Sequence, residues 1–407
     1  MKKTQSGDLM YNKRMYSLGN SGSVIREIFE YGRKRRAEIG DDKVFDFSLG
    51  NPSVPAPDEI NKSIKEIVDS SDPTVLHGYT TARGDIDARA AIADDLNRRF
   101  HTDFGPGELF LTMGAAASLS AVLHGLCEQG DEFIVISPFF PEYRVFIESA
   151  GGKLVDVPAD RANSFAPDIR AIDNAINGHT KAVIINSPNN PTGKVYTKGE
   201  ITALSELLKR RSEGHDPIFL ISDEPYRELI YTGIEYPFVT DYYDNSIICY
   251  SYSKSLSLAG ERIGYVLVPS KLTCHDGIYA AVAGAARALG YVCAPSLFQH
   301  VIARCAGCTS DISVYDRNRK LLYGRLTELG FECVYPDGAF YLFMKSPIDD
   351  ENDFCEIAKK HELLLVPAGS FGAPGYVRIS YCVSSETVEK SLPAFSALAD
   401  EVFVNRL

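Results

Sequence analysis

The sequence has no tryptophan, no long apolar run and no excess of positive charge. No stretch approaches the roughly 18 apolar residues of a membrane-spanning helix, so an integral membrane protein is not predicted. With 42 Lys and Arg against 54 Asp and Glu, the formal charge is −12. An acidic protein is repelled by nucleic acid and by anionic membranes, so neither is expected as the main partner. Residues 1–8 are charged but lead into no apolar block, so no signal peptide is predicted.

Cysteine is present but shows no paired arrangement. Nine cysteines are scattered through apolar runs of the 407 residues, as is typical of reduced thiols in a cytoplasmic protein. Cys305 and Cys308 have the spacing of a redox motif. No second pair and no convincing preceding strand accompany them, so we interpret this spacing as incidental. No metal site is predicted.

Apolar strand patterns alternate with amphipathic helix patterns through the middle of the chain. Continuous apolar strands separated by helices predict a mostly parallel sheet that is covered on both faces. The predicted strands are 109–112, 133–137, 154–157, 182–186, 218–222, 247–250 and 263–268. The fold class is therefore α/β, with a mostly parallel seven-stranded sheet in a large domain.

The pattern changes after about residue 300, where an α+β texture begins. We predict a hairpin across Asp337-Gly338, a helix over 354–361, a strand over 376–381 and a last helix over 388–402. We expect residues 1–60 to form an arm and part of a smaller domain, residues 61–300 the large domain, and residues 301–407 the rest of the smaller one. Within the first segment, residues 1–23 read as a polar arm with little periodicity.

Lys254 follows the predicted strand 247–250 and has small hydroxyl residues beside it. Burial disfavours the ammonium form, and a neutral amine can condense with an aldehyde to give a Schiff base. Ser251 and Arg262 add a hydroxyl and a planar cation, which are groups that bind phosphate. An amine nucleophile beside a phosphate site suggests pyridoxal phosphate (PLP). In the alternative interpretation, Lys254 is a surface lysine and Arg262 a salt-bridge partner.

Other strand ends carry compatible side chains, and ligands bind at the carboxyl ends of parallel strands. Asp223 precedes Lys254 by 254 − 223 = 31 residues, one strand–connection–strand unit. A buried carboxylate there can keep a pyridine nitrogen protonated, although Asp223 can also be a helix cap. Tyr226 and Asn190 can donate to the phenolic oxygen of the cofactor, and Asn190 also lies in a plain turn sequence.

Further candidates lie at helix starts, in loops and in the smaller domain. Ala115 and Ala116 open a helix after a strand and offer backbone amides to an anion. Phe140 is placed either to stack on a cofactor ring or to pack in the core. Arg378, inside an apolar strand, suits a substrate α-carboxylate or a structural salt bridge. The loop at Gly50 can contact the same carboxylate.

Together these segments resemble the class I/II, fold-type I, PLP-dependent aminotransferases of the aspartate aminotransferase type. The resemblance runs from Gly50 to Arg378 and is carried by Lys254 among small residues, followed by Gly260-x-Arg262-x-Gly264. It implies an enzyme that moves an amino group between an L-amino acid and a 2-oxo acid. Aspartate, aromatic and alanine-type donors all stay open.

The resemblance also implies a role for each candidate. Lys254 holds PLP and moves a proton. The cofactor ring is bound by Asp223, Asn190, Tyr226 and Phe140, and its phosphate by Ser251, Arg262, Ala115, Ala116 and Tyr79 of a second subunit. The substrate is bound by Arg378, Gly50 and Asn190. The active unit is then a homodimer with shared sites. Alternatively, Tyr79 is a buried loop residue that packs within its own subunit.

Two other functions use the same fold. Carbon–sulfur β-lyases and cyclopropane-carboxylate synthases share these motifs, because the same carbanion can expel a substituent instead of being reprotonated. A non-enzymatic regulator needs a DNA-binding module, whereas only about 23 residues precede the first predicted helix and the charge is acidic. The sequence therefore favours an enzyme.

Overall fold

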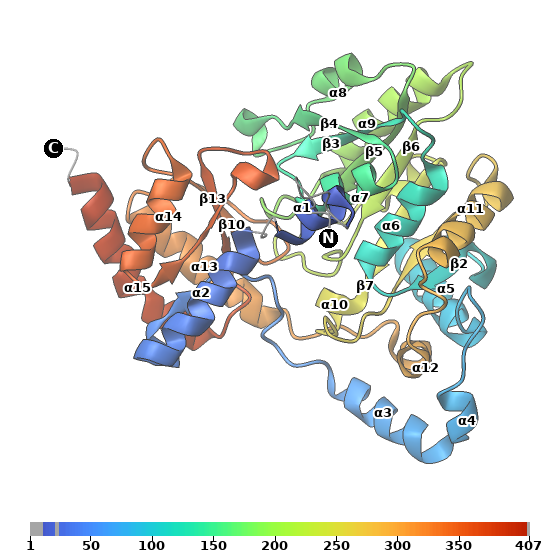
Figure 1. The fold of residues 1–407 in the computed structure, drawn as a ribbon, viewed down its shortest axis with the longest axis horizontal. Helices are drawn as coiled ribbons and strands as arrows, with labels where there is room; N and C mark the ends of the chain where they lie inside the picture. Colours follow the sequence, from blue (N-terminus) through green and yellow to red (C-terminus); the bar gives the residue numbers. More distant parts are fainter. Residues whose placement is uncertain (1–10, 21–23, 405–407) are drawn as a thin grey trace, which may run out of the picture.

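The computed structural model describes residues 11–20 and 24–404 and contains a seven-stranded sheet (Figure 1). In order across the sheet the strands are β2 (Leu109–Thr112), β8 (Gly264–Leu267), β7 (Ser246–Ser251), β6 (Phe219–Asp223), β5 (Thr180–Asn186), β3 (Glu132–Ser137) and β4 (Lys153–Pro158). β8 is antiparallel to β2 and β7, and the other pairs are parallel. The predicted α/β class with a mostly parallel seven-stranded sheet is confirmed.

The strands are apolar along their length because both faces of the sheet are covered. In β5, Ala182 and Ile184 belong to one apolar cluster, whereas Val183 and Ile185 belong to another on the opposite face. The first cluster includes residues of α6 (Ala115–Leu126), α7 (Glu142–Ser149) and α11 (His275–Ala288). The second includes residues of α5 (Ile86–Phe100), α8 (Ile169–Ala175), α9 (Lys198–Ser212) and α12 (Ser296–Cys305).

A smaller antiparallel sheet lies beside this three-layer body. Its strand order is β12 (Val366–Pro367), β13 (Tyr376–Ser380), β10 (Tyr341–Lys345) and β9 (Cys333–Val334). Its helices are α13 (Ser313–Glu328), α14 (Glu351–Lys360) and α15 (Ser385–Ala399). The N-terminal part of the chain joins it, since β1 (Phe45–Asp46) pairs in parallel with β11 (Leu363–Leu364) and Phe47 lies in the same apolar cluster.

The hairpin of the smaller sheet differs from the tight Asp-Gly turn that the sequence predicts. Val334 pairs with Phe343, so the connection spans residues 335–342. Gly338 instead forms a β-bridge with Ile230. A Cβ added at Gly338 would lie 2.5 Å from the carbonyl oxygen of Leu229. The glycine is therefore required for close approach to the larger part of the chain rather than for a two-residue turn.

The predicted arm also differs where the structure describes it. Residues 1–10 and 21–23 lie outside the described residues, but α1 (Lys13–Asn20) is a helix with no buried residue. The first predicted helix, which about 23 residues precede, is present as α2 (Val24–Ile39). The arm thus contains regular structure that its weak periodicity did not indicate.

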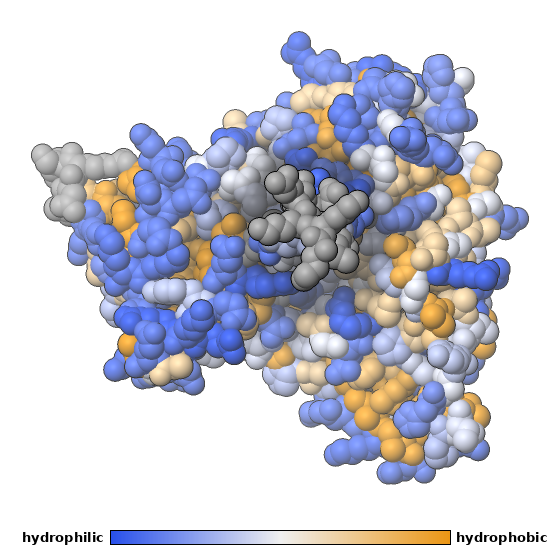
Figure 2. All heavy atoms as spheres, viewed as in Figure 1, coloured by the Kyte–Doolittle hydropathy of each residue, from blue (hydrophilic) through white to orange (hydrophobic). Residues whose placement is uncertain are grey.

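The domain boundaries near residues 60 and 300 stay predictions. α3 (Asp58–Ser70) and α12, which lie close to those two positions in sequence, contact each other, and α4 (Pro73–Leu76) follows α3. Among residues 11–20 and 24–404, no helix combines the length and the apolar character needed to cross a membrane. Figure 2 shows a mainly hydrophilic face with an apolar patch over α3 and α4.

Candidate active site

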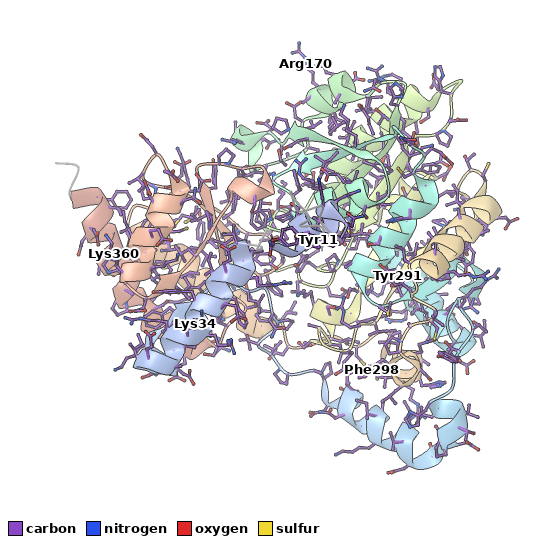
Figure 3. The ribbon with its side chains drawn as sticks, viewed as in Figure 1. Tyr11, Lys34, Arg170, Tyr291, Phe298 and Lys360 are labelled. Atoms are coloured by element: carbon purple, nitrogen blue, oxygen red, sulfur yellow. The ribbon has the colours of Figure 1, made fainter. Side chains whose placement is uncertain are left out.

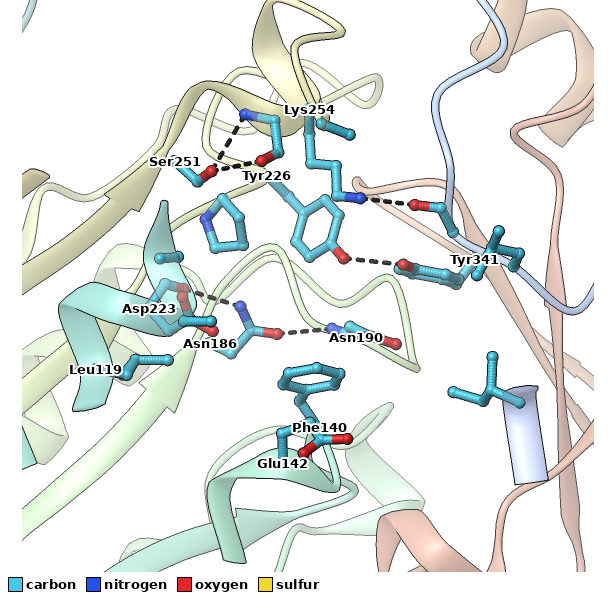
Figure 4. Close-up of a pocket in the computed structure, with 18 of the residues that line it drawn as sticks. Leu119, Phe140, Glu142, Asn186, Asn190, Asp223, Tyr226, Ser251, Lys254 and Tyr341 are labelled. Carbon is cyan, nitrogen blue, oxygen red and sulfur yellow. Dashed lines mark hydrogen bonds between the residues drawn. The ribbon is translucent and has the colours of Figure 1, made fainter. Parts of the chain in front are cut away.

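A cavity of about 480 Å³ lies at the carboxyl ends of β5, β6 and β7, facing the smaller sheet (Figure 4). The topology explains its position, because parallel strands present their carboxyl ends at one edge of the sheet. All the sequence-predicted site residues except Tyr79 line it: Gly50, Ala115, Ala116, Phe140, Asn190, Asp223, Tyr226, Ser251, Lys254, Arg262 and Arg378.

Lys254 lies in α10 (Tyr252–Ser255), a single turn that follows β7 directly. Its Nζ donates a hydrogen bond to the carbonyl oxygen of Gly50 at 2.6 Å, which directs the amine into the cavity (Figure 4). Burial lowers the pKa of Lys254 to about 8, and the positive charges of Arg262 and Arg378 act in the same direction. The amine is therefore partly neutral near physiological pH, as a nucleophile requires. Lys254 is not the surface lysine of the alternative interpretation.

Asp223 ends β6 and is buried. Its Oδ2 accepts a hydrogen bond from the hydroxyl of Tyr143 at 2.5 Å, whereas its buried Oδ1 has no partner among the described residues. Burial raises the pKa of Asp223 to about 7, against the lowering effect of the Tyr143 hydrogen bond. No helix begins after Asp223, since residues 225–228 form turns. The helix-cap interpretation is therefore wrong, and Oδ1 is left for a ligand.

Two asparagines link Asp223 to the opposite wall. Asn186, the last residue of β5, pairs in register with Asp223 and donates from Nδ2 to its carbonyl oxygen at 2.8 Å. Asn186 Oδ1 accepts from the backbone amide of Asn190 at 2.7 Å. Asn190 Oδ1 in turn accepts from Arg378 Nη1 at 3.1 Å. The backbone amide and the side-chain oxygen of Asn190 are therefore both hydrogen-bonded, and its side-chain NH₂ group stays available as a donor.

The hydroxyl of Tyr226 shares a hydrogen bond of 2.8 Å with that of Tyr341, from β10 of the smaller sheet (Figure 4). Burial raises the pKa of Tyr226 well above its ordinary value and that of Tyr341 to about 12, so both stay protonated. A Cβ added at Gly50 would lie 2.1 Å from the Tyr341 hydroxyl oxygen. Only glycine therefore lets this loop approach the two tyrosines.

The start of α6 and the Arg262 segment form a polar cradle at one end of the cavity. Arg262 Nη1 donates to Ser253 Oγ at 3.3 Å, and Ser253 Oγ shares a hydrogen bond of 2.7 Å with Ser251 Oγ. Gly114, with φ of +88°, precedes the helix, and a Cβ added there would lie 2.7 Å from Arg262 Nη2. The first amides of a helix have no intrahelical acceptor, so those of Ala115 and Ala116 are available to an anion.

Arg378 is buried on β13 and also lines the cavity. Besides Asn190, its guanidinium donates from Nη2 to the carbonyl oxygen of Ser48 at 2.5 Å and lies over the ring of Tyr341. Its Nε has no partner, and none of the ion pairs among the described residues includes it. The structural salt bridge of the alternative interpretation is therefore absent, and the cation is free to pair with an incoming carboxylate.

Phe140 and Tyr79 occupy different surroundings. Phe140 follows β3, and its ring faces the cavity opposite Asn190 (Figure 4). Tyr79 lies outside the cavity with 90% of its surface exposed. The interpretation of Tyr79 as a buried residue of its own subunit is therefore wrong.

Three further residues of the site, Tyr143, Asn186 and Tyr341, were not among the site residues predicted from the sequence. Tyr143 lies three residues after Phe140, in the first turn of α7. Asn186 was visible as the last residue of a predicted strand beside the strand of Asp223. Tyr341 comes from a different sheet, and no local pattern links it to the site.

The family model of class I and II aminotransferases matches residues 42–395. The chain belongs to this family. An aspartate aminotransferase from Thermotoga maritima is 30% identical over 376 residues, covering 90% of this chain and 95% of that protein. An aspartate/prephenate aminotransferase from Thermus thermophilus is also 30% identical, over 86% of this chain and 89% of its own. A solved amino transferase structure from Eubacterium rectale has 55% identity and a TM-score of 0.94, covering 97% of this chain and all of that one.

The protein is therefore a PLP-dependent aminotransferase with the fold-type I architecture. The residues present fit this cofactor. The unpartnered Oδ1 of Asp223 suits a protonated ring nitrogen, the polar cradle suits a phosphate, and Lys254 supplies an amine between them. Aminotransferase relatives of this chain act on amino acids and 2-oxo acids.

Proposed function

We propose that Lys254, Asp223 and Arg378 carry the transamination. The proposal is supported by one arrangement: an amine of lowered pKa, an unpartnered carboxylate oxygen and a guanidinium without an ion-pair partner share one cavity. When bound, PLP supplies an aldehyde that an amine can attack and an electron-withdrawing ring that stabilises negative charge on the substrate α-carbon. The side chains around it bind, orient and move protons.

We assign the cofactor contacts by the donors and acceptors that are available. Asp223 Oδ1 accepts from the ring nitrogen, and Tyr143 holds the other oxygen of that carboxylate in place. Asn190 and Tyr226 donate to the phenolic oxygen, with Phe140 against the ring. The phosphate is bound by Ser251, Arg262 and the amides of Ala115 and Ala116.

We place the substrate site at the guanidinium of Arg378, which has no ion-pair partner among the described residues. Arg378 binds the α-carboxylate of the amino acid, with the loop at Gly50 beside it and Asn190 fixing the guanidinium. Lys254 Nζ would take the proton from the substrate α-carbon and deliver it to the cofactor. Because several similar enzymes are named aspartate or aspartate/prephenate aminotransferases, we expect dicarboxylic or aromatic donors to be accepted.

Reduction and a substrate panel test this proposal. Borohydride treatment of the PLP-loaded enzyme should fix the cofactor to Lys254, as peptide mapping would show, and an adduct on another lysine would refute the assignment. Amino donors assayed with 2-oxoglutarate should yield the matching 2-oxo acids. Release of ammonia and pyruvate in place of transfer would instead identify a β-lyase.

We further propose a cytoplasmic homodimer with shared active sites. Tyr79 and Val75, 90% and 69% exposed, leave aromatic and apolar surface that a partner subunit would cover. Tyr79 then reaches the phosphate of the second subunit. The nine free cysteines suit a reducing compartment, and the net charge of −12 gives no support to a nucleic-acid or membrane partner.

Mixing two impaired variants tests the shared site. A hybrid of Tyr79→Phe and Lys254→Ala subunits contains one site that carries neither change. It should therefore regain activity above both parents. If hybrids form without this gain, Tyr79 does not act across the interface.

A further inference from the structure

The loop that carries Tyr79 is held by a helix distant in sequence. The loop connects α4, which ends at Leu76, to α5, which begins at Ile86. α12 packs against α5 and α3, and Figure 3 marks it with Phe298. The hydroxyl of Ser296, at the start of α12, donates to the carbonyl oxygen of Leu76. The loop is thereby anchored on the N-terminal side of Tyr79.

Gln299, one turn further along α12, anchors the other side. Its Oε1 accepts from the backbone amide of Asp85 at 2.6 Å. Its Nε2 donates to Thr80 Oγ1 at 3.0 Å and to the carbonyl oxygen of Ala294 at 2.6 Å. Gln299 has 0% of its surface exposed, and both of its N–H groups and its oxygen are engaged.

A buried amide of this kind is not explained by packing alone. The neighbouring buried residues of α12 include Val301 and Ile302, which supply apolar contact with the core. Burying an amide is costly unless its hydrogen bonds are made, and here two of the three fix the loop. Asp85 also caps α5 by accepting from Asp87 and Ala88, so Gln299 contacts the loop at the residue that caps this helix.

Two further contacts hold the C-terminal end of the loop against β2. Gly84 has φ of +96°, and a Cβ added there would lie 2.5 Å from Leu111 of β2. The amide of Leu111 donates to the carbonyl oxygen of Arg83 at 3.0 Å. Tyr79 is thus exposed although the loop is hydrogen-bonded to neighbouring elements on both sides of it. This arrangement suits a Tyr79 side chain that contacts a second subunit.

We infer that Gln299 is a positioning residue for the cofactor site of the opposite subunit, acting through Tyr79. The inference rests on the proposed shared site. Gln299 does not line the cavity of its own chain. A substitution of Gln299 that weakens PLP binding in the opposite subunit would therefore indicate this positioning role. A general structural role would affect the stability of its own subunit instead.

The dissociation constant of PLP measures the effect directly. Loss of a hydrogen bond to a charged group costs about tenfold to a hundredfold in affinity, so Tyr79→Phe should weaken PLP binding by about that factor. Gln299→Leu should weaken it up to the same factor while the protein stays dimeric. The double variant should bind PLP no more weakly than Tyr79→Phe alone, because both changes remove one interaction.

A matched control separates this effect from lost stability. Asn318 is also fully buried and donates to the carbonyl oxygens of Tyr381 and Val383 in the smaller part of the chain. Asn318→Leu should lower the unfolding temperature without changing the PLP dissociation constant. Should Gln299→Leu fail to fold, Thr80→Val removes the hydroxyl that Gln299 binds and should weaken PLP binding in the same way.

Hybrid dimers then decide in which subunit Gln299 acts. In a hybrid of Gln299→Leu and Lys254→Ala subunits, the site that contains Lys254 receives its Tyr79 loop from the subunit with an intact Gln299. Its activity should therefore reach half-saturation at the wild-type PLP concentration. A half-saturation that stays as high as in Gln299→Leu would overturn the inference.

The single variants distinguish failure of the inference from failure of the shared site. If Tyr79→Phe weakens PLP binding and neither Gln299→Leu nor Thr80→Val does, the positioning role is wrong, whereas the contact of Tyr79 with the cofactor stands and the hybrid of Tyr79→Phe and Lys254→Ala subunits tests the shared site separately. If Tyr79→Phe leaves PLP binding unchanged, the shared site itself fails, and the inference fails with it.

Discussion

Asp223→Asn should stabilise the cofactor-free protein increasingly as the pH rises. Burial raises the pKa of Asp223 from 3.8 to about 7. Between these two values the native state holds a proton that the unfolded state releases, so the wild-type protein loses stability as the pH rises. Asparagine cannot titrate, so the variant does not share this loss.

The magnitude follows from the two pKa values. The wild-type protein loses about 1.4 kcal/mol of unfolding free energy for each pH unit below the raised pKa of Asp223. The unfolding free energy of the variant relative to wild type should therefore rise by about 3 kcal/mol between pH 5 and pH 8. Unfolding entropy is about 2 cal/mol/K per residue, so for 407 residues this corresponds to about 3 °C in Tm. The buried amide adds a cost that does not depend on pH, and this cost cancels when the two pH values are compared.

Thermal unfolding of the two apoproteins across this pH range is the assay. Asp350→Asn is the control, because its exposed carboxylate has a lowered pKa and stays ionised from pH 5 to pH 8. Its difference from wild type should be flat. A flat difference for Asp223→Asn as well would refute the raised pKa and the role that we assign to burial. Adding PLP should stabilise wild type more than the variant, because only the carboxylate pairs with the ring nitrogen.

Three further outcomes are expected. The reaction of the apoprotein with PLP should accelerate with pH and level off above about pH 8, the pKa of Lys254; a rise that continues to pH 10 would show an ordinary lysine. Arg378→Lys should raise KM for amino acids by about tenfold or more, through loss of the two-pronged carboxylate contact, while PLP affinity stays unchanged; a parallel loss of PLP binding would contradict the assignment. Tyr143→Phe should raise the pKa of Asp223 further, visible in the apoprotein as a fall of Tm that continues to higher pH than in wild type; a fall that ends at the same pH would show that the Tyr143 hydrogen bond does not hold the carboxylate.

The sequence alone was sufficient for the class of fold and for the edge of the sheet that carries the chemistry. Apolar runs separated by amphipathic helices indicate a covered, mostly parallel sheet, and the carboxyl ends of its strands meet at one edge. Lys254, Asp223 and Asn190 follow three such strands. Their meeting in one cavity therefore follows from local patterns combined with a topological rule.

Only the tertiary structure decided which polar side-chain atoms have a hydrogen-bond partner and which have none. Tyr143 occupies one oxygen of Asp223 and leaves the other unpartnered, and Tyr341 reaches Tyr226 from a separate sheet. Gln299 contacts a loop more than 200 residues earlier in the chain. Such partners depend on how side chains pack through space between distant elements. Local periodicity reports which face of a helix or strand is buried, but not which residue lies against it.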